Sequence, residues 1–472
     1  MAAESMVSGM PGLPVDLLLV ILDDYPFARF AAKSVMDALP RPWNRVCISD
    51  IQSPAQCEWA RGRGLVVNEA CLGIWAYQGD LDLLKWAVLQ PWCPALTARV
   101  CRQAALGGEL GVLQWARGRG CPWDKSTCAN AAFSGSMEVL LWARANGCPG
   151  EDVICLHAAL GGRMEVLIWA RANGCDWDAD TTIAAAEFGQ LAVLQWLVAN
   201  GCDWDADTTI FAADAGHLAV LKWLVANGCA LHAVVCRSAA GGGQLAVLQW
   251  ARENGCPWDE TTCSAAARGG HMEVLRWARA NGCEWSAATC SGAAGGGHME
   301  VLQWARANGC DWCEKTCWSA AVGGRLDIIQ WARARGCPWD SRTTRDAARY
   351  GHLEILWWAR ANGCPWDKSV CVRFALDGRL DMLRWARAHG CPWSAGTCGA
   401  AASGGHLEVL QWARSQGCPW DMDTCMSAAI GGHLEVLQWA RSNGCDWDAG
   451  RICEAARAHP RVVEWARANG CP

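Results

Sequence analysis

Residues 259–285 read DETTCSAAARGGHMEVLRWARANGCEW, and this block decides the fold because it recurs end to end along the chain. Its marker tryptophan returns every 27 residues, at Trp142, Trp169, Trp196, Trp223, Trp250, Trp277, Trp304, Trp331, Trp358, Trp385, Trp412 and Trp439. A strict period of this length is typical of a solenoid, in which each unit stacks on its neighbours. The repeated positions are therefore expected to build a scaffold, and the unrepeated positions to recognise a target.

The first half of the block predicts a short helix. Asp259 is a suitable N-cap, because its side chain can accept a backbone hydrogen bond. The small residues Ala266 and Ala267 allow this helix to pack closely, and Gly269 and Gly270 are expected to end it. Each block thus opens with a helix that can approach its neighbours closely.

The second half of the block predicts an amphipathic helix from about His271 to Asn281. One face of this helix carries, at helical spacing, Val274, Leu275, Trp277 and Ala278. A single block cannot bury this face alone. We therefore expect the tryptophans and valines of stacked blocks to form one continuous core.

A short loop follows the second helix. Gly282 is expected to supply the left-handed residue that ends the helix. Cys283 and Trp285 are expected to fold back as an apolar clasp beneath the next block. Every block is thus predicted to consist of a helix, a two-glycine turn, a second helix and a short loop.

Five short segments of the block keep a fixed order and separation: Thr261-Thr262, Ala266-Ala267, Gly270-His271, Glu273-Val274-Leu275 and Gly282-Cys283. In this pattern the blocks resemble ankyrin repeats, although each is about six residues shorter than the usual ~33. The missing residues imply that the β-hairpin finger is reduced to a tight loop. The W-A-R…G-C-x-W style is similar to repeat arrays encoded by giant DNA viruses of amoebae.

The resemblance implies an all-α, ankyrin-like helix-turn-helix solenoid of about 15–16 short repeats over residues 51–472. It does not name a target, because one fold hosts many functions. Two places break the period. The spacing from Trp86 to Trp115 stretches to 29 residues, and residues 458–460 replace the glycine turn of the last block, so local irregularity is expected at both.

Residues 1–50 precede the array and have a helical apolar pattern that opens with Leu-Pro. The residues that carry this pattern are Leu13, Pro14, Leu17, Leu18, Ile21, Leu22 and Trp43. They resemble an F-box, which implies docking to a Skp-family adaptor of a cullin-type ubiquitin ligase. The stretch to Trp43 is about three residues too long for an F-box, and Pro40 and Pro42 interrupt it. The alternative is an N-terminal cap that covers the first repeat.

The composition favours a cytoplasmic protein. The apolar run Leu17 to Leu22 is short and is flanked by Asp16 and Asp23, so no secretory signal peptide is predicted. No apolar run approaches the ~20 residues that span a bilayer, and no membrane partner is expected. The net charge is −6 and the basic residues are spread evenly, which argues against a nucleic-acid partner.

The chain has 30 cysteines, most of them in two periodic columns. One column holds Cys263, Cys290, Cys317, Cys371, Cys398 and Cys425, and the other holds Cys256, Cys283, Cys310, Cys337, Cys364, Cys391, Cys418 and Cys445. Equivalent positions of stacked helices lie roughly 8–10 Å apart, beyond the roughly 7 Å Cα limit for a disulfide. The cysteines are therefore interpreted as small buried hydrophobes.

The C-x-x-C of Cys310 and Cys313, with Cys317 nearby, would suit a zinc or redox site. No histidine lies at ligand spacing, so a structural role is favoured and no metal or cofactor is expected. No phosphate-binding glycine loop, H-E-x-x-H or nucleophile elbow is present in the sequence. We therefore expect no enzymatic activity.

Two further ladders are interpreted as architecture. Six histidines share one turn position and are expected to bond the backbone at the start of the second helix: His217, His271, His298, His352, His406 and His433. Arginines two residues after the marker tryptophans include Arg252, Arg279, Arg306 and Arg333. They are expected to pair on a solvated surface with Glu273, Glu300 and Asp327.

Recognition is expected where the first helix varies, because these positions line the concave face of ankyrin arrays. The candidate target-binding residues are Gln103, Leu106, Asn130, Phe133, His157, Leu160, Phe211, Asp346, Arg349, Arg373 and Leu376. Phe133, Leu160, Phe211 and Leu376 are expected to be apolar residues facing solvent, mixed with charges as in a protein-binding patch. The alternative is that they fill gaps left by the missing fingers.

These observations favour an interaction protein without enzymatic activity. The hypothesis is an adaptor that holds a target protein on the array and docks a host ubiquitin ligase through residues 1–50. One alternative is a scaffold or decoy without a ubiquitin link. Another, from a different class, is a cysteine-based metal or redox protein.

Overall fold

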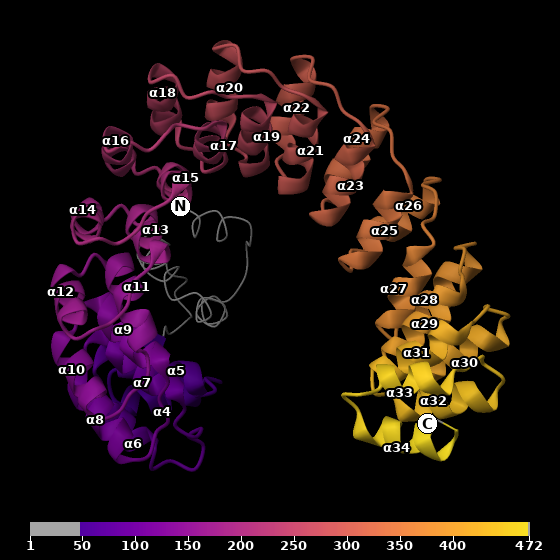
Figure 1. The fold of residues 1–472 in the computed structure, drawn as a ribbon, viewed down its shortest axis with the longest axis horizontal. Coiled ribbons are helices and arrows are strands. Elements are labelled where there is room, and N and C mark those ends of the chain that lie inside the picture. Colours follow the sequence, from indigo (N-terminus) through magenta and orange to yellow (C-terminus); the bar gives the residue numbers. More distant parts are fainter. Residues whose placement is uncertain (1–47, 471–472) are drawn as a thin grey trace. The chain divides into compact units, whose positions relative to one another are not determined.

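The computed structural model describes residues 48–470. All regular structure in this range is helical, with one 3-10 helix, η1 (Ile48–Asp50), the α-helices α4 to α34, and no strand. Figure 1 shows the helices following one another along the chain in pairs joined by short turns. The chain divides into an N-terminal unit, Met1–Trp258, and a C-terminal unit, Asp259–Pro472. This division falls inside the predicted array.

In both units the odd-numbered helices are the first helices of the blocks and the even-numbered helices are the second. The first helices of the N-terminal unit are α5 (Glu69–Gln78), α7 (Ala98–Gly107), α9 (Lys125–Ser134), α11 (Glu151–Gly161), α13 (Ala179–Glu187), α15 (Ala206–Ala215) and α17 (Ala233–Gly241). Its second helices are α4 (Pro54–Arg61), α6 (Leu81–Ala87), α8 (Leu110–Gly118), α10 (Met137–Ala145), α12 (Met164–Ala172), α14 (Leu191–Ala199), α16 (Leu218–Ala226) and α18 (Leu245–Glu253).

The first helices of the C-terminal unit are α19 (Glu260–Gly269), α21 (Ala287–Gly296), α23 (Glu314–Val322), α25 (Ser341–Arg349), α27 (Ser369–Leu376), α29 (Ala395–Ser403), α31 (Met422–Ile430) and α33 (Ala449–Ala455). Its second helices are α20 (Met272–Ala280), α22 (Met299–Ala307), α24 (Leu326–Ala334), α26 (Leu353–Ala361), α28 (Leu380–Ala388), α30 (Leu407–Ser415), α32 (Leu434–Ser442) and α34 (Pro460–Ala468). With α4 counted as a half block, the described range agrees with the predicted 15–16 helical repeats, and the strand finger is absent from it.

The block 259–285 confirms the predicted local structure. The Asp259 carboxylate accepts a hydrogen bond of 2.9 Å from the Thr261 amide, as an N-cap should. Helix α19 ends at Gly269, and Gly270 adopts a left-handed φ of +77°. After α20, Gly282 again has a positive φ, of +85°. Local chemistry therefore sets the ends of both helices.

First helices form the close-packed layer of each unit. Consecutive first helices, such as α19 and α21, pack directly against each other, whereas second helices contact mainly the first helix of their own block. The alanine pair makes this possible, since Ala266 and Ala267 are fully buried. The second helices are consequently held apart from one another.

The core differs from the prediction in one respect. Val274, Leu275 and Ala278 are buried as expected, but the marker Trp277 is only half-buried. Because the second helices do not touch closely, the indole lies at the edge of the core. The clasp tryptophan Trp285 packs edge-on against Trp304 of the next block, with ring centroids 5.8 Å apart. In this block the core is thus aliphatic, with a border of tryptophan.

The predicted pairing of the arginine ladder with acidic residues is wrong. Among the described residues, no ion pair joins Arg279, Arg306 or Arg333 to Glu273, Glu300 or Asp327. Instead, the Arg279 guanidinium donates to the Cys283 carbonyl and lies 4.2 Å above the Trp285 ring. The arginine therefore stabilises the clasp through both a hydrogen bond and a cation–π contact.

The clasp is also tied to its own first helix. The Cys283 thiol donates to the carbonyl of Asp259, with Sγ 3.3 Å from the oxygen. The same contact recurs at Cys256 and at Cys310. The clasp thus closes the block on itself through its cysteine and reaches the next block through its tryptophan.

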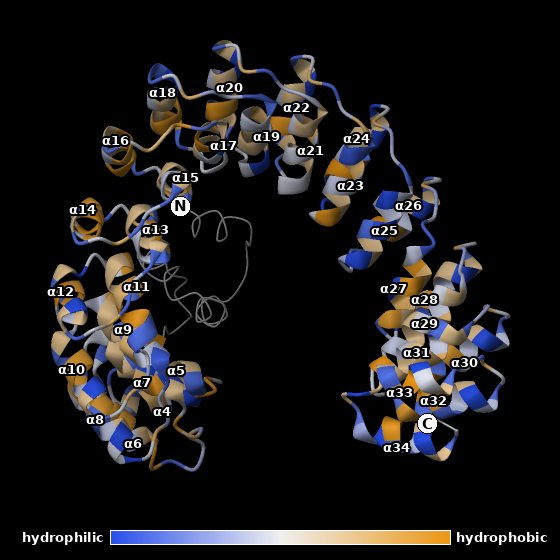
Figure 2. Ribbon diagram, viewed as in Figure 1, coloured by the Kyte–Doolittle hydropathy of each residue, from blue (hydrophilic) through white to orange (hydrophobic). Residues whose placement is uncertain are grey.

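Figure 2 shows that α14 and α16 are more hydrophobic than most second helices. In these two helices Leu197-Val198 and Leu224-Val225 replace the usual Ala-Arg pair. Their blocks consequently lack the arginine that elsewhere holds the clasp carbonyl.

The histidine ladder bonds the backbone, as predicted, but its partner lies in the preceding block. The Nε2 atom of His433 donates to the carbonyl of Ser403 at 3.0 Å, and His406 does the same to Leu376 at 3.1 Å. Gln244 occupies the equivalent position and donates to Asp214 at 3.1 Å. We call this side chain the latch, because it joins the start of a second helix to the end of the first helix of the preceding block.

One cysteine departs from the predicted unpaired state. Cys453 is disulfide-bonded, whereas the other described cysteines are free thiols. It lies one residue beyond Ile452, which holds the column position in α33. The distance between cysteines of one column therefore does not apply to Cys453.

Within residues 48–470, no helix is both long enough and apolar enough to cross a membrane.

The glycine turn can be tested within the block 259–285. Gly270→Ala should lower the free energy of unfolding of its block by about 2–5 kcal/mol, because the left-handed φ costs roughly 1–2 kcal/mol and overpacking adds about 1–3 kcal/mol. An added Cβ would lie 2.4 Å from the His298 ring. The measurement is native-state hydrogen exchange of the α19 and α20 amides.

Gly282→Ala is the matched control, since Gly282 shares the positive φ but has nothing within 4 Å of an added Cβ. We expect this variant to lower the free energy of unfolding by only the cost of the left-handed φ, about 1–2 kcal/mol. Equal losses in the two variants would contradict the role assigned to the latch ring.

Candidate functional site

Several of the predicted first-helix residues are buried. Phe133 and Leu160 are 8% and 7% exposed, so the prediction that they face solvent is wrong. They form an apolar cluster with Leu106 and Ala184, against which Tyr77, Leu156 and Phe188 pack. Close contact between first helices turns these side chains toward their neighbours, which supports the gap-filling alternative.

The polar members of the predicted set are mostly engaged inside the chain. The buried Asn130 donates to the Arg102 carbonyl at 2.9 Å, and His157 bonds the Val153 carbonyl at 2.8 Å. Gln103 is also buried. The side chains of these residues therefore stabilise the first-helix layer.

Two charged candidates are paired. The buried Asp346 forms an ion pair of 2.8 Å with Arg345, and Arg373 forms one of the same length with Asp377. These pairings leave little free charge at either position for a ligand.

The other first-helix candidates are exposed: Phe211, Arg349 and Leu376. Leu376 borders a hollow of about 270 Å³ on the first-helix layer of the C-terminal unit. The floor of the hollow consists of Gly396, Gly399 and Ala400 of α29. A target-binding role for the exposed candidates stays a prediction.

The adaptor-binding candidates, Leu13, Pro14, Leu17, Leu18, Ile21, Leu22 and Trp43, lie outside the described residues. In the C-x-x-C segment, Cys310 and Cys317 are buried and Cys313 is the N-cap of α23. In the described part of the chain, no three His, Cys, Asp or Glu side chains are arranged to hold a metal ion.

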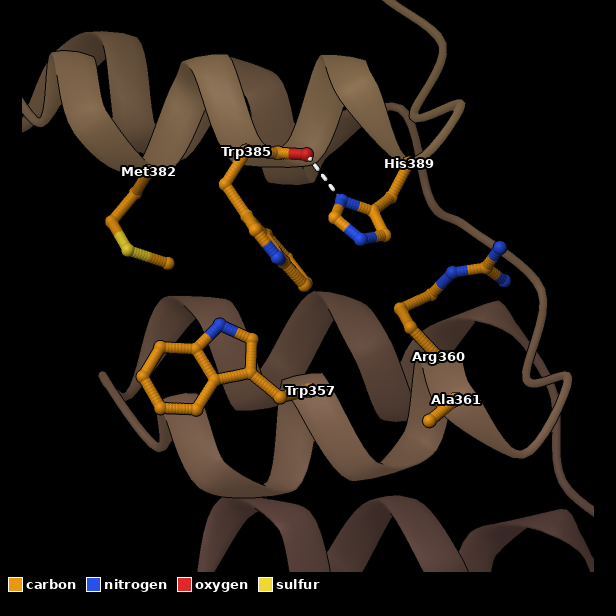
Figure 3. Close-up of a pocket in the computed structure, with 6 residues that line it drawn as sticks. All are labelled: Trp357, Arg360, Ala361, Met382, Trp385 and His389. Atoms are coloured by element: carbon orange, nitrogen blue, oxygen red, sulfur yellow. Dashed lines mark hydrogen bonds between the residues drawn. The ribbon is translucent and has the colours of Figure 1, made fainter.

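A larger pocket, of about 480 Å³, lies between the second helices α26 and α28. Figure 3 shows Trp357 rising from α26 toward Met382 and Trp385 of α28, with His389 at the end of α28. Arg360 and Ala361 complete the wall on α26. The pocket exists because second helices are held apart by the contact between first helices.

Three of the residues that line this pocket break the repeat. Trp357 occupies a column that is Gln330 in the preceding block and Arg384 in the following one. Met382 replaces the valine or isoleucine of most other blocks, and His389 is the one histidine in a column of asparagine, glutamine and arginine. Unrepeated residues from adjacent blocks therefore meet at one place.

The Trp357 side chain contacts the marker tryptophan of the next block, as other residues of its column do. In two other blocks the equivalent arginine lies 5.7 Å above the next marker tryptophan, as Arg384 does over Trp412. Trp357 instead meets Trp385 edge to face, with centroids 6.3 Å apart, and remains 44% exposed. An aromatic wall thus replaces a polar cover, and it presents a large apolar surface to solvent.

His389 keeps the cap of its helix and adds a ring to the pocket. Its Nδ1 donates to the Trp385 carbonyl at 2.8 Å, the same bond that Asn362 makes to Trp358. The imidazole lies 4.7 Å from the Trp385 ring, tilted by 33°. Because Nδ1 carries the hydrogen, Nε2 of the neutral ring is an acceptor at the exposed rim.

The Arg360 charge is engaged by the scaffold. Its guanidinium donates to the Cys364 carbonyl and lies 4.6 Å above the Trp366 ring. The interior of the pocket is therefore formed by Trp357, Met382 and Trp385. This arrangement suits an aromatic or large aliphatic group rather than an anion.

This site is not apparent from variation in the first helices, because its residues belong to the second helices α26 and α28. The position before each marker tryptophan is polar in every block except three, which carry Leu141, Ile168 and Trp357. All three side chains are exposed on second helices. Three apolar residues in a polar column were the signal that could have found it.

No family model and no curated protein matches the chain. Among solved structures, the pentatricopeptide repeat protein PPR10 from maize is similar at 14% identity over 97% of this chain and 93% of its own, with a TM-score of 0.28. Its complex with an 18-nt psaJ RNA element is similar at 14% identity over 100% and 95%, with a TM-score of 0.22.

The human ASB11 ankyrin repeat domain is similar at 18% identity over 39% of this chain and 84% of its own, with a TM-score of 0.23. The succession of helix pairs, each stacked on the next within a unit, is that of a helical repeat solenoid.

The dual role of His389 can be tested by two substitutions. His389→Asn restores the usual cap and should change the free energy of unfolding by less than about 0.5 kcal/mol. His389→Ala removes the hydrogen bond to the Trp385 carbonyl and should cost about 0.5–1.5 kcal/mol. Urea unfolding of the full chain measures both. A larger loss for asparagine than for alanine would contradict the assigned bond.

Proposed function

We propose that this chain is a protein-binding repeat scaffold whose pocket between α26 and α28 holds an apolar anchor side chain of a partner protein. The observation that carries the proposal is the convergence of Trp357, Met382 and His389. Each departs from the repeat, and all three line one pocket. Architecture alone does not require them, since the other blocks stack without them.

The chemistry of the pocket supports a protein partner. Tryptophans that lose their remaining water on association are enriched among the energetic centres of protein interfaces. Trp357 offers such a surface, and the His389 rim offers a hydrogen-bond acceptor for a backbone amide. An aromatic or large aliphatic residue on an extended or helical segment would fill the space between the two helices.

A binding role is favoured over catalysis. The titratable residues that line the pocket are Arg360 and His389, and the first is engaged with the clasp carbonyl and Trp366. Acid, base and nucleophile chemistry needs several convergent polar groups. One exposed imidazole beside apolar walls does not provide them.

RNA is the other class of ligand to consider, since one similar solved structure contains an RNA element. The arginine ladder argues against it here. These guanidinium groups donate to clasp carbonyls and stack on tryptophans, as Arg279 and Arg171 do. With a net charge of −6, few cations remain to neutralise phosphates.

The ubiquitin-ligase link is a finer proposal that rests on the F-box-like pattern of residues 1–50. In that proposal the array holds the partner protein and the N-terminal segment docks a Skp-family adaptor of the host. Such an adaptor acts by proximity, since tethering raises the effective concentration of ligase near target. A scaffold or decoy without this link is the alternative.

The pocket is tested by returning it to the repeat consensus. The double variant Trp357→Gln with His389→Asn should fold as the wild type does. Peptides selected from a displayed random library against the wild-type chain should share an aromatic or large aliphatic residue. Their Kd should rise at least tenfold in the double variant, and each tenfold corresponds to about 1.4 kcal/mol. Isothermal calorimetry measures the change.

Gln303→Ala is the matched control, because it alters the same column on α22, away from the pocket. It should leave the affinity unchanged. Peptides that bind the double variant and the wild type equally would remove the pocket from the proposed function. A wild-type chain that binds a random RNA pool and no peptide would replace the protein partner with RNA.

The adaptor link has its own test. A purified Skp-family adaptor should co-elute with the full chain in gel filtration. Changing Leu17 and Leu18 together to Asp should abolish co-elution, because charges would replace the apolar face predicted for the docking helix. A wild-type chain that never retains the adaptor, or a folded double variant that still retains it, would leave the scaffold without a ligase link.

A further inference from the structure

Two columns of buried cysteines meet inside the blocks. Cys317 of α23 and Cys337 of the following clasp are fully buried, and their Sγ atoms lie 3.8 Å apart. In two equivalent blocks the first-helix thiols of Cys128 and Cys290 donate to the clasp carbonyls of Cys148 and Cys310 at 3.9 Å. In each equivalent pair one thiol shifts the pKa of the other: Cys101 with Cys121, Cys128 with Cys148, Cys236 with Cys256, Cys263 with Cys283, Cys290 with Cys310, Cys371 with Cys391, Cys398 with Cys418 and Cys425 with Cys445. Each block of this kind therefore contains a preformed dithiol.

Cysteines of one column in neighbouring blocks are too far apart to form a disulfide. The pairs instead join two columns within one block, 20 residues apart in the chain. The clasp brings the second cysteine back over the start of the first helix.

The fold does not require a thiol in the first-helix column. Threonine takes that position at Thr182, Thr209 and Thr344. The Thr344 hydroxyl donates to the Pro365 carbonyl at 3.0 Å, and Thr182 donates to Asp203 at the same distance. A threonine hydroxyl at this position therefore holds the clasp by donating a hydrogen bond to one of its carbonyls. A thiol at this position adds the ability to form a sulfur–sulfur bond.

The two thiols of a pair differ in acidity. The hydrogen bond to Cys337 and burial raise the pKa of Cys317. The hydrogen bond received from Cys317 lowers the pKa of Cys337, and the Arg333 guanidinium lowers it further. The clasp cysteine is thus the one that ionises first, and a thiolate is the nucleophile in thiol–disulfide exchange.

We propose that the dithiols are oxidation sites, at which a low-molecular-weight disulfide such as oxidised glutathione converts the two facing thiols of a block into an intra-block disulfide. The bond would tie the clasp covalently to its own first helix. Oxidation would therefore fasten the array block by block, without joining neighbouring blocks.

The reaction balances as two exchange steps. The Cys337 thiolate attacks the small disulfide, which forms a mixed disulfide and releases one small thiolate. That thiolate takes the proton of Cys317, and the resulting Cys317 thiolate attacks Cys337 and displaces the second small thiolate, which is protonated by water. Two cysteines are oxidised by two electrons, and one small disulfide is reduced to two thiols. Because both sulfurs are buried, access requires local opening of the clasp.

The experiment uses the full chain with glutathione disulfide, followed by alkylation of free thiols, proteolysis and mass spectrometry without reduction. We expect cross-linked peptides that join Cys317 to Cys337 and the other same-block pairs. Cys364 provides an internal control, because Thr344 holds the position of its partner cysteine, so Cys364 should be alkylated or carry a glutathione adduct. The oxidised chain should also unfold at a higher temperature than the reduced chain, and a reductant should reverse this shift.

Cys317→Thr is the matched variant, since the chain already uses threonine at Thr344. It should keep its helicity by circular dichroism and lose the Cys337 cross-link alone. Cross-links that join different blocks, or a loss of helicity on oxidation, would overturn the proposal. So would the absence of same-block cross-links when hydrogen exchange shows that the clasps open during the incubation.

Discussion

Direct contact between consecutive first helices is the constraint on which the other features depend. Alanine pairs such as Ala266 and Ala267 permit it, and the second helices contact mainly the first helix of their own block rather than one another. The aliphatic core between neighbouring second helices must then be shielded from water, and large side chains at its edge do so. The marker tryptophans, the clasp tryptophans and the stacked arginines are all consequences of that need. The pocket beside Trp357 is the place where the cover is aromatic and left open.

The sequence predicted what is decided locally. The two helices of the block 259–285, the Asp259 cap and the left-handed Gly270 and Gly282 follow from side chains within a few positions of each other. Such features depend on short-range sterics and hydrogen bonding, and the 27-residue period multiplied them along the chain. The solenoid was therefore accessible without any knowledge of long-range contacts.

What the sequence could not supply is which columns face each other. Phe133 and Leu160 were assigned to solvent, yet the close first-helix layer buries them against one another. Arg279 was assigned an acidic partner, although the carbonyl of the returning clasp is nearer. The meeting of cysteine columns, and of Trp357 with His389, likewise depends on how the loop and the second helices are placed. Periodicity fixes the members of a column but not the distance between columns.

The latch gives each unit a direction. In His433 and Gln244 alike, a side chain at the start of a second helix satisfies a carbonyl that belongs to the block before it. During synthesis, the end of a newly made first helix consequently waits for a residue about 30 positions later in the chain. Assembly on the ribosome would trail the growing chain by one block. The same polarity makes the two ends of a unit inequivalent to truncation: a cut on the C-terminal side leaves the last first helix without its latch donor, whereas one on the N-terminal side leaves a latch side chain without its carbonyl.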